Sequence, residues 1–337
     1  GDHRDLHRLI RRQRQMCIRD RDFPFERILC RTEQSLGHGV ITDIRDIVYV
    51  KRDALDSHAT PEIARQVGGQ IVSADSMKIY RRMDIGTAKP SAEARAEIPH
   101  HCIDVVEPSE SFSVARYVEC ADRAIASIGQ SGAVPLVVGG TSLYVKALSE
   151  GLFDGPGRDA QLRGRLESRA DAEGTPALHA ELARVDPQAA RRIHPNDRLR
   201  IIRALEVHRA PAGPSGGPGK RPPPFRWLAL GLTAPRPEVY RRTDARVDAM
   251  FRRGLVDEVR GLLAKGYGPE RPALSGIGYR QVVAFLQGET SLAGAIARVK
   301  TETHRLVRHQ YAWFRPGDER IHWLDITTDF ESEAERL

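Results

Sequence analysis

The sequence predicts an α/β fold, in which a mostly parallel sheet carries a helical insertion. Short apolar runs alternate with amphipathic segments between residues 59 and 150, the pattern of strands followed by helices. Strand patterns then stop between residues 156 and 209, and an apolar run returns at 226–232. A chain of 337 residues is long enough for one large domain or two ordinary ones.

In the first half, four apolar runs bounded by polar residues or glycine are predicted as strands, at 41–50, 70–76, 100–106 and 133–140. A helix ending at Gly68 precedes the second run. An amphipathic helix begins near Ser113, and another is opened by Thr141 or Ser142 after the fourth run. Apart from the first run, residues 1–58 have no sustained helical or strand period.

In the second half, helical periodicity predicts three helices in the insertion and three after it, at 158–174, 175–186, 195–209, 237–266, 277–287 and 291–314. Between the two groups, residues 211–224 contain six prolines and four glycines, which indicates a loop or connector. Strands are predicted at 226–232 and 321–327. The predicted divisions are 1–58, 59–155 (α/β core), 156–224 (helical insertion and linker), 225–328 (return to the core) and 329–337 (tail).

The net charge of +7 is distributed unevenly along the chain. Residues 191–315 carry 24 Lys and Arg against 10 Asp and Glu, whereas residues 61–190 are acidic overall. A basic block of this size is typical of a surface for a polyanion such as a nucleic acid. A solvated arginine-rich surface is the alternative, and charge alone does not decide between them.

Several classes of protein are disfavoured. No apolar run approaches the ~20 residues that span a bilayer, and residues 1–15 lack the apolar region of a signal peptide. The four cysteines, Cys17, Cys30, Cys102 and Cys120, form no C-x-x-C pair. Neither a disulfide framework nor a zinc site is expected, and a reducing cytoplasm fits.

Two motifs follow predicted strands directly. In SADSMKIYRRMDIGTAKP (73–90), Asp75 lies at the carboxyl end of a strand, where α/β proteins bind ligands and a carboxylate can act as a general base. Taken alone, a capping role for Asp75 is the commoner use. In VVGGTSLYVKAL (137–148), two glycines allow close approach, and Thr141 and the helix N-terminus can face an anion. An ordinary strand-to-helix turn is the alternative there.

Three further motifs lie in the basic block. SGIGYRQVVAFLQGE (275–289) offers Tyr279 and Arg280 for stacking or phosphate contact. KTETHRLVRHQYAWFR (300–315) has a basic face with Arg305 and Arg308, for which a solvated helix face is the alternative. PNDRLRIIRALEVHR (195–209) places Arg200 and Arg203 on one side of a helix.

Together with IPHHCIDVVEPSESFSVARY (98–117), these motifs resemble, in order, the bacterial tRNA dimethylallyltransferase (isopentenyl-diphosphate:tRNA transferase) family. The resemblance runs from about Glu62 to Asp325. It implies a P-loop-type α/β core with a helical insertion. It also implies transfer of a dimethylallyl group from dimethylallyl diphosphate to the exocyclic N6 of adenosine 37, beside the anticodon. The partners implied are the tRNA anticodon stem-loop and dimethylallyl diphosphate, with Mg²⁺ as cofactor, and we expect a cytoplasmic monomer.

The resemblance also implies roles for individual residues. Asp75 would be the general base, and Thr141 would hydrogen-bond near the reacting amine or the diphosphate. The tRNA-binding residues implied are Asp75, Ser76, Met77, Lys78, Thr141, Arg163, Leu199, Arg200, Ile201, Ile202, Arg203, Ser275, Gly276, Ile277, Gly278, Tyr279 and Arg280.

The sequence departs from the family pattern near its start. The family has a P-loop, G-P-T-x-x-G-K-[ST], which holds the diphosphate and supplies a Ser or Thr ligand to Mg²⁺. Residues 40–55 read VITDIRDIVYVKRDAL and contain no such motif. We therefore expect the first strand and P-loop to be missing or replaced, with a gap in the sheet and impaired catalysis. Residues 1–58 are either a sequence artefact, which we favour because the other motifs are intact, or a true loss of the diphosphate site.

Three other functions fit parts of the sequence less well. A non-catalytic tRNA-binding remnant would keep the basic surface without transfer. An adenylate-type isopentenyltransferase would act on a free nucleotide, but a small nucleotide needs no basic surface of this extent. A small-molecule kinase is disfavoured because no phosphate loop is recognisable.

Overall fold

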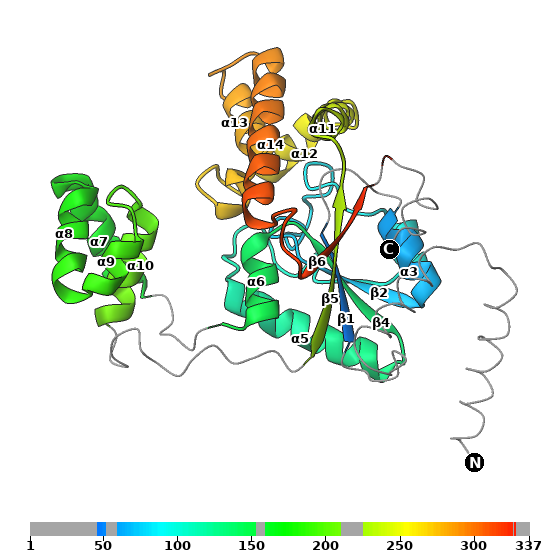
Figure 1. Cartoon of the computed structure of the whole chain (residues 1–337). Coiled ribbons are helices and arrows are strands. Elements are labelled where there is room, and N and C mark those ends of the chain that lie inside the picture. The colour runs from blue at the N-terminus through cyan, green and yellow to red at the C-terminus, as the bar shows by residue number, and fades with distance from the viewer. Residues whose placement is uncertain (1–45, 52–58, 153–158, 210–224, 326, 328–337) are drawn as a thin grey trace, which may run out of the picture. The chain divides into compact units, whose positions relative to one another are not determined.

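The computed structural model describes residues 46–51, 59–152, 159–209, 225–325 and 327. Within them the chain divides into two compact units, one formed by residues up to 146 together with those from 224 onward, and the other by residues 147–223. The first unit contains the sheet, and the second is the helical insertion (Figure 1). No helix among the described residues is long and apolar enough to cross a membrane.

The sheet has six parallel strands in the order β3-β2-β4-β1-β5-β6. The strands are β1 (Asp46–Lys51), β2 (Gly69–Ser73), β3 (His100–His101), β4 (Val134–Gly139), β5 (Arg226–Thr233) and β6 (Ile321–Asp325). This confirms the predicted α/β class. Because all strands are parallel, their carboxyl ends meet along one edge of the sheet, which is where ligands bind in such folds.

The expected gap in the sheet is not present, because a strand forms within the predicted 41–50 run and occupies the position of the first strand. β1 lies in the middle of the sheet, with Val48 paired to Leu136 of β4 on one side and to Leu228 of β5 on the other. The run DIVYVK supplies the β-branched and aromatic residues that strands favour, so it forms a strand without the rest of the family's first motif. The connection that follows, residues 52–58, lies outside the described residues, and so does the predicted absence of a P-loop.

Alternation along the strands separates two faces of the sheet. One face carries Leu136, Val138, Leu230 and Leu232, which pack against Ile63 of α3 (Ala59–Val67) in one buried cluster. α5 (Val114–Gln130) contacts β2 and β4, and none of its residues belongs to that cluster. Helices therefore cover both faces, as a doubly wound parallel sheet requires to bury its apolar surface.

The helices after β5 are arranged differently from the prediction. The segment predicted as one helix over 237–266 is divided into α11 (Arg236–Arg252) and α12 (Leu255–Ala264). Gly254 separates them with a φ of +96°, a left-handed conformation that glycine adopts at little cost. η1 (Pro272–Ser275), α13 (Tyr279–Leu286) and α14 (Leu292–Trp313) follow. Figure 1 shows α11 directly following the end of β5.

Two short helices were not predicted. α4 (Ala92–Glu97) begins at the Ser91 cap, and α9 (Pro187–Arg192) begins at the Asp186 cap. Each has only six residues, too few for a periodic apolar pattern to be seen in the sequence.

The insertion contains α7 (Ala160–Glu173), α8 (Thr175–Val185), α9 and α10 (Arg198–Arg209). The four helices share a core of their own, built around Leu166, Leu178, Leu182, Ile201 and Leu205, all of them fully buried. A separate core explains why this segment forms a compact unit within the chain.

Candidate active site

The carboxyl ends of β2 and β4 bring Asp75 and Thr141 into neighbouring turns. The backbone N–H of Thr141 donates to the carbonyl of Ala74 at 3.1 Å. The Thr141 hydroxyl accepts the backbone N–H of Ser76 at 3.0 Å and lies 3.3 Å from the Ser76 Oγ. A Cβ at Gly139 would come within 2.3 Å of the Ala74 carbonyl oxygen, so the two turns approach this closely only because position 139 is glycine.

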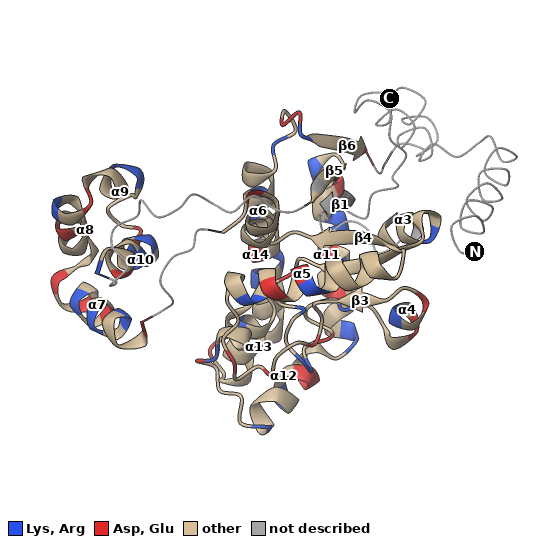
Figure 2. Cartoon of the chain, turned by 90° about the horizontal axis from the view of Figure 1, so that it is seen from below, with Lys and Arg blue, Asp and Glu red and all other residues tan. Residues whose placement is uncertain are grey.

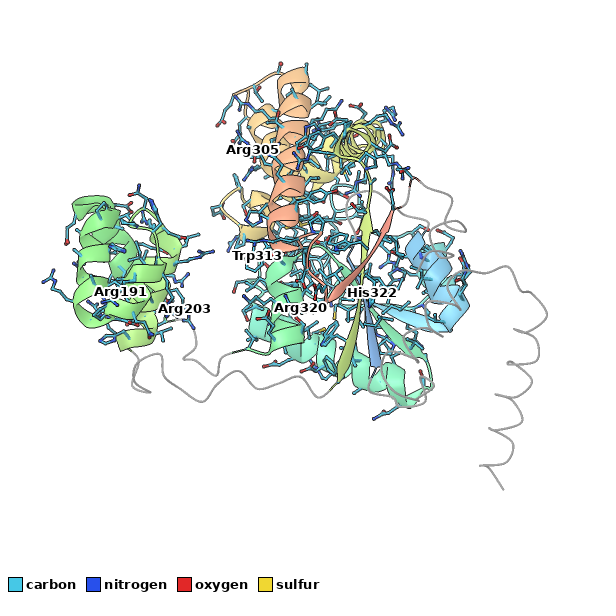
Figure 3. The ribbon with its side chains drawn as sticks, viewed as in Figure 1. Arg191, Arg203, Arg305, Trp313, Arg320 and His322 are labelled. Carbon is cyan, nitrogen blue, oxygen red and sulfur yellow. The ribbon has the colours of Figure 1, made fainter. Side chains whose placement is uncertain are left out.

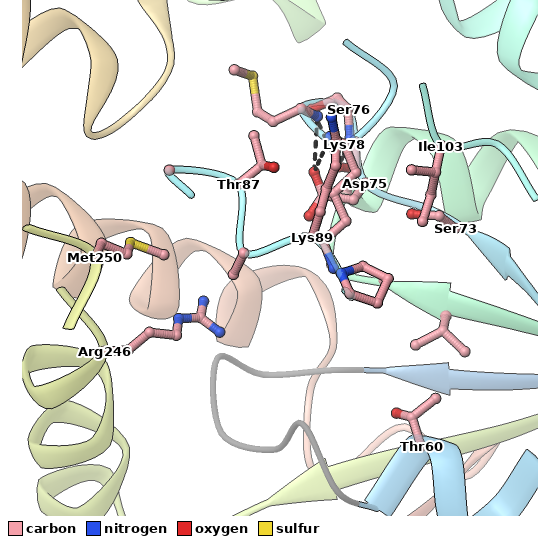
Figure 4. Close-up of a pocket in the computed structure, with 18 of the residues that line it drawn as sticks. Thr60, Ser73, Asp75, Ser76, Lys78, Thr87, Lys89, Ile103, Arg246 and Met250 are labelled. Atoms are coloured by element: carbon pink, nitrogen blue, oxygen red, sulfur yellow. Dashed lines mark hydrogen bonds between the residues drawn. The ribbon is translucent and has the colours of Figure 1, made fainter. Parts of the chain in front are cut away.

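Asp75 organises its own turn. Its Oδ1 accepts the backbone N–H of Met77 at 2.8 Å and that of Lys78 at 3.4 Å. Figure 4 shows the carboxylate with these bonds at the edge of the cavity described below. From the sequence, Asp75 could be a general base or a capping residue. The structure shows that its Oδ1 has the capping role. An aspartate can cap with one oxygen and still present the other to a ligand.

A cavity of about 1590 Å³ opens beside these turns, and Asp75, Ser76, Met77, Lys78 and Thr141 all line it. A pocket for one drug-sized ligand measures roughly 300–1,000 Å³, so this cavity has room for two reactants. Its wall also includes Gly86–Pro90, Arg246 and Met250 of α11, and Ser275–Gly278. Figure 4 shows Arg246 and Met250 across the cavity from Asp75.

Lys89 and several arginines are among the cations that line the cavity. Lys89 is 1% exposed at its side chain and donates to Asp84 at 2.8 Å, to Asp104 at 2.7 Å and to the Tyr80 carbonyl at 2.5 Å. Its ammonium group is therefore fully used in bracing the loop. The arginines of α11 that line the cavity are Arg241, Arg242, Arg246 and, just past the helix, Arg253.

The arginines of α11 are not among the site residues predicted from the sequence. Arg242, Arg246 and Met250 are spaced four apart, so they lie on one side of the helix. A search for arginines repeating every four residues on the strand-following helix would have found them.

The loop at 275–280 is brought to the same cavity. Ser275, Gly276, Ile277 and Gly278 line it, and a Cβ at Gly276 would lie 2.3 Å from the Met77 methyl group. The 275–278 loop therefore rests directly on the Asp75 turn. Two segments about 200 residues apart thus form one wall, as the sequence-based site assignment requires.

The expected role of Tyr279 is corrected by its burial. Its side chain is 0% exposed and its hydroxyl donates to Glu258 at 2.7 Å, so the ring is not available to stack on a base. Arg280 is half exposed and pairs with Glu302 at 3.0 Å.

In the insertion, the predicted RNA-facing residues divide into buried and exposed. Ile201 and Ile202 are at most 1% exposed and belong to the core of the insertion, so the predicted contact of their side chains with RNA is corrected. The side chain of Arg200 is 67% exposed and Leu199 is 72% exposed. A helix necessarily alternates its faces, and a continuous run of five residues cannot all face one partner.

Arg163 and Arg203 both contact one buried carboxylate. Arg163 makes two hydrogen bonds to Glu206, at 2.8 and 2.7 Å, and Arg203 approaches it at 3.4 Å. The side chain of Glu206 is only 2% exposed. The hydrogen bonds from Arg163 hold the pKa of Glu206 below its ordinary value, although burial opposes this shift.

The basic block is partly neutralised within the fold. Arg198 pairs with Asp171 at 2.5 Å and Arg209 pairs with Glu181, so acidic residues before position 190 balance arginines after it. Figure 2 shows acidic and basic residues interspersed on the helices. Among the labelled arginines of Figure 3, Arg191 and Arg203 belong to the insertion and Arg305 to α14.

Comparison with known proteins gives a consistent picture. A family model described as IPP transferase matches residues 78–317. The tRNA dimethylallyltransferase of Geobacter metallireducens is 46% identical over 275 residues, which covers 80% of this chain and 89% of that protein. The tRNA dimethylallyltransferase of Thermomicrobium roseum is 48% identical over 280 residues, which covers 82% and 85% of the two chains.

Solved structures agree with the fold. The full-length tRNA isopentenylpyrophosphate transferase of Bacillus halodurans has a TM-score of 0.64 and 35% identity, covering 87% of this chain and 94% of that one. A eukaryotic dimethylallyltransferase acting on tRNA has a TM-score of 0.72 over 87% of this chain and 77% of that one. At 24% identity, the second likeness concerns the fold alone.

Proposed function

Because this chain belongs to the IPP transferase family and its relatives above are named tRNA dimethylallyltransferases, we propose that it acts on tRNA in the same way. It would transfer a dimethylallyl group from dimethylallyl diphosphate to N6 of adenosine 37. The observation that carries the proposal is the junction of the Asp75 and Thr141 turns at the edge of a cavity large enough for two reactants. The cavity also has an arginine-bearing wall on α11, which suits an anionic leaving group.

Asp75 is proposed as the general base. The N6 amine is a weak nucleophile because its lone pair is delocalised into the purine. A carboxylate that accepts the N6 proton while the C–N bond forms lowers this barrier. Since Oδ1 of Asp75 is used by the Met77 and Lys78 N–H groups, Oδ2 is the oxygen assigned to the proton.

Thr141 and Ser76 are proposed to orient the reacting amine. Their hydroxyls lie 3.3 Å apart beside Asp75, and both line the cavity. A hydroxyl can donate to one partner and accept from another, so a rotation of the O–H is enough to accommodate the amine. Holding the two reactants in line supplies much of the rate enhancement in a transfer of this kind.

The leaving diphosphate is proposed to meet the α11 wall. Positive charge develops on the allylic carbon as the diphosphate departs, and cations stabilise the departing anion. Arg246 belongs to that wall and lies across the cavity from Asp75 (Figure 4). The sequence between β1 and α3 reads RDALDSH and contains neither glycine nor lysine, so we propose that this chain relies on its arginines more than a P-loop enzyme would.

Magnesium is proposed only as an ion that would arrive with the diphosphate. No group of three His, Cys, Asp or Glu side chains converges among the residues that the structure describes. The described residues therefore offer no site in which protein side chains alone would hold the ion. Mg²⁺ is commonly held by one or two carboxylates together with substrate phosphates.

For the tRNA, we propose that the target base leaves its stack and enters the cavity. Enzymes that act on a base inside a folded nucleic acid use this step to reach the reacting atom. The exposed side chains of Leu199 and Arg200 on α10 and of Arg280 on α13 are proposed to contact the anticodon arm. Contacts from Arg200 and Arg280 to phosphates would position the RNA and make its binding salt-dependent.

The test is dimethylallyl transfer to an anticodon stem-loop by the full chain and by Asp75→Asn. Asparagine keeps an oxygen for the Met77 N–H, so the turn is preserved while the base is removed. We expect the transfer rate to fall by roughly 10²–10⁴-fold with unchanged stem-loop affinity. Asp257→Asn, at an exposed carboxylate of α12, is the matched control and should transfer normally.

Two outcomes would favour other functions. Tight, salt-dependent binding of the stem-loop without transfer by the wild-type chain would identify a non-catalytic tRNA-binding protein. Transfer to AMP, with no binding of the stem-loop, would identify an adenylate-type isopentenyltransferase.

A further inference from the structure

One carboxylate outside the proposed chemistry has an unusual set of partners. Oε2 of Glu258 accepts the backbone N–H groups of Asp84 at 2.8 Å and Ile85 at 2.7 Å. Its Oε1 accepts the backbone N–H of Gly86 at 3.2 Å and the Tyr279 hydroxyl at 2.7 Å. Three consecutive backbone N–H groups converging on one anion form a nest, and here a side chain of the same protein occupies it.

These partners belong to two different loops, the second of which ends at Tyr279, the first residue of α13. Residues 84–86 lie at the start of the loop that lines the cavity through Gly86–Pro90, and Tyr279 directly follows the cavity-lining residues 275–278. The two loops also touch each other, because a Cβ at Gly86 would lie 2.6 Å from the Tyr279 ring. Glu258, on α12, is therefore bonded to both loops at their point of contact.

The rest of the loop is braced from within. The Thr87 hydroxyl donates to the Met83 carbonyl at 2.5 Å, and the Lys89 N–H donates to the Asp84 carbonyl at 3.0 Å. With Lys89 also anchored to Asp104, the loop is a stiff unit. The position of such a loop within the protein depends on the bonds that attach it to its surroundings. Glu258 makes one such attachment, on the side of the loop that faces Tyr279.

We propose that Glu258 is a positioning residue, which holds the 84–90 and 275–279 loops in register so that the base enters the cavity aligned with Asp75. The second loop is linked to Asp75 through Met77. Gly276 of that loop packs against the Met77 methyl group, and Met77 is two residues from Asp75. Glu258 itself does not line the cavity. The proposal deepens the proposed function and rests on it for its catalytic consequence, while the loop attachment can be tested without substrates.

The first measurement is hydrogen exchange of the full chain without substrates. In Glu258→Gln an amide NH₂ replaces one acceptor oxygen and faces N–H donors, so the attachment is lost in part. We expect the amides of residues 84–86 to exchange at least about tenfold faster, because each lost charge-assisted bond lowers the opening free energy of the loop. Amides of α5 should keep their protection. Asp257→Asn, one residue away and solvent-exposed, is the control and should leave residues 84–86 protected.

The second measurement separates kcat from KM for dimethylallyl transfer to the stem-loop. A misplacement of about 1 Å can cost about a hundredfold in rate, so Glu258→Gln should lower kcat by roughly 10- to 100-fold. The KM for the stem-loop should change by less than about twofold, because its charged contacts are untouched. Tyr279→Phe should lower kcat less, and adding it to Glu258→Gln should cost little more, since both changes break the same attachment.

The outcomes distinguish this proposal from the proposed function. Unchanged exchange at residues 84–86 in Glu258→Gln, or faster exchange that extends equally to α5, would overturn the positioning role. A normal kcat in Glu258→Gln would also overturn it. Absence of transfer by the wild-type chain would count against the proposed function instead, and the exchange at residues 84–86 would still decide whether Glu258 holds the loops.

Discussion

The hydroxyl of Thr141 accepts the backbone N–H of Ser76 at 3.0 Å, although the two residues are 65 positions apart in the chain. The bond joins the turn after β4 to the turn after β2, and so places a hydroxyl beside the Asp75 carboxylate. A second contact, from the Gln310 amide of α14 to the Gly140 carbonyl at 3.2 Å, holds the glycine turn from the other side. Each bond pairs a side-chain group with a backbone group at the carboxyl end of a strand, so the sheet determines where the two turns lie.

Loss of the Thr141 hydroxyl should weaken both stability and transfer. In Thr141→Val the partly buried Ser76 N–H has no acceptor at that position, which costs about 1–3 kcal/mol. We expect a matching fall in the free energy of unfolding, measured by urea denaturation, and slower single-turnover transfer. Thr141→Ser retains the oxygen and is the control. Equal stability of the valine and serine variants would contradict the role of this bond.

The insertion should become less stable in acid through Glu206. Because Arg163 lowers the pKa of Glu206 in the folded chain, the unfolded chain binds the proton more readily. The stabilisation is therefore present at neutral pH and is lost as the pH falls below the ordinary pKa of 4.5 and through the lower folded pKa. Urea titrations read by pulsed hydrogen exchange of α7 and α10, at pH 7 and pH 4, measure this loss.

The charge of Glu206 can be removed directly. Glu206→Gln should cost about 3–5 kcal/mol at pH 7, because it leaves the mostly buried Arg163 guanidinium without its charged partner. The variant should also lose the part of the pH dependence that Glu206 contributes, while Glu181, whose pKa is lowered by Arg169 and Arg209 against the effect of burial, keeps its own part. Glu173→Gln, in an exposed pair with Arg169, should change stability by less than about 0.5 kcal/mol. A pH dependence as large in Glu206→Gln as in the wild-type chain would assign the effect to the other carboxylates of the insertion.

Salt should weaken tRNA binding less in Arg200→Ala than in the wild-type chain. The side chain is 67% exposed on α10, and a phosphate contact there releases about one counterion. The slope of log K against log salt concentration should therefore fall by about 1, as measured by fluorescence anisotropy of a labelled stem-loop. Arg320→Ala removes one positive charge from the turn before β6 and should keep the wild-type slope. Identical slopes in the two variants would remove Arg200 from the RNA contact.

Cys120 should be the reactive thiol of the Cys102–Cys120 pair, whose sulfur atoms lie 3.4 Å apart. The Cys102 thiol donates to the Cys120 sulfur and, with help from Arg123, lowers the pKa of Cys120 to about 7 despite burial. The same bond and burial raise the pKa of Cys102. Alkylation by iodoacetamide, mapped by mass spectrometry, should modify Cys120 with a rate that rises with pH and is half-maximal near pH 7.

Removing the donor tests the cause of that reactivity. In Cys102→Ala the midpoint for Cys120 should move up toward the ordinary value of 9.0, so that labelling at pH 7 becomes slower. A midpoint near 9 in the wild-type chain, or equal labelling of Cys102 and Cys120, would contradict the assignment.

The strands and the Asp75 and Thr141 turns could be predicted because their signals are local. An apolar run followed by polar residues indicates where a buried parallel strand ends, and the ends of parallel strands share one edge. The motifs around those ends carried the family resemblance. The break at Gly254 and the short helices α4 and α9 were not predicted, because a break inside a periodic pattern and a six-residue helix leave little trace in periodicity.

By itself, the sequence determined the α/β class, the helical insertion, the family and the pair of strand-end motifs. Only the tertiary structure decided that Tyr279 is buried against Gly86, that Ile201 and Ile202 are core residues, and that β1 completes the sheet. It also decided that Arg246 lines the cavity and that Glu258 binds two loops. The reason is physical: hydrophobic periodicity depends on neighbours in sequence, whereas burial and hydrogen-bond partners depend on residues that only folding brings together.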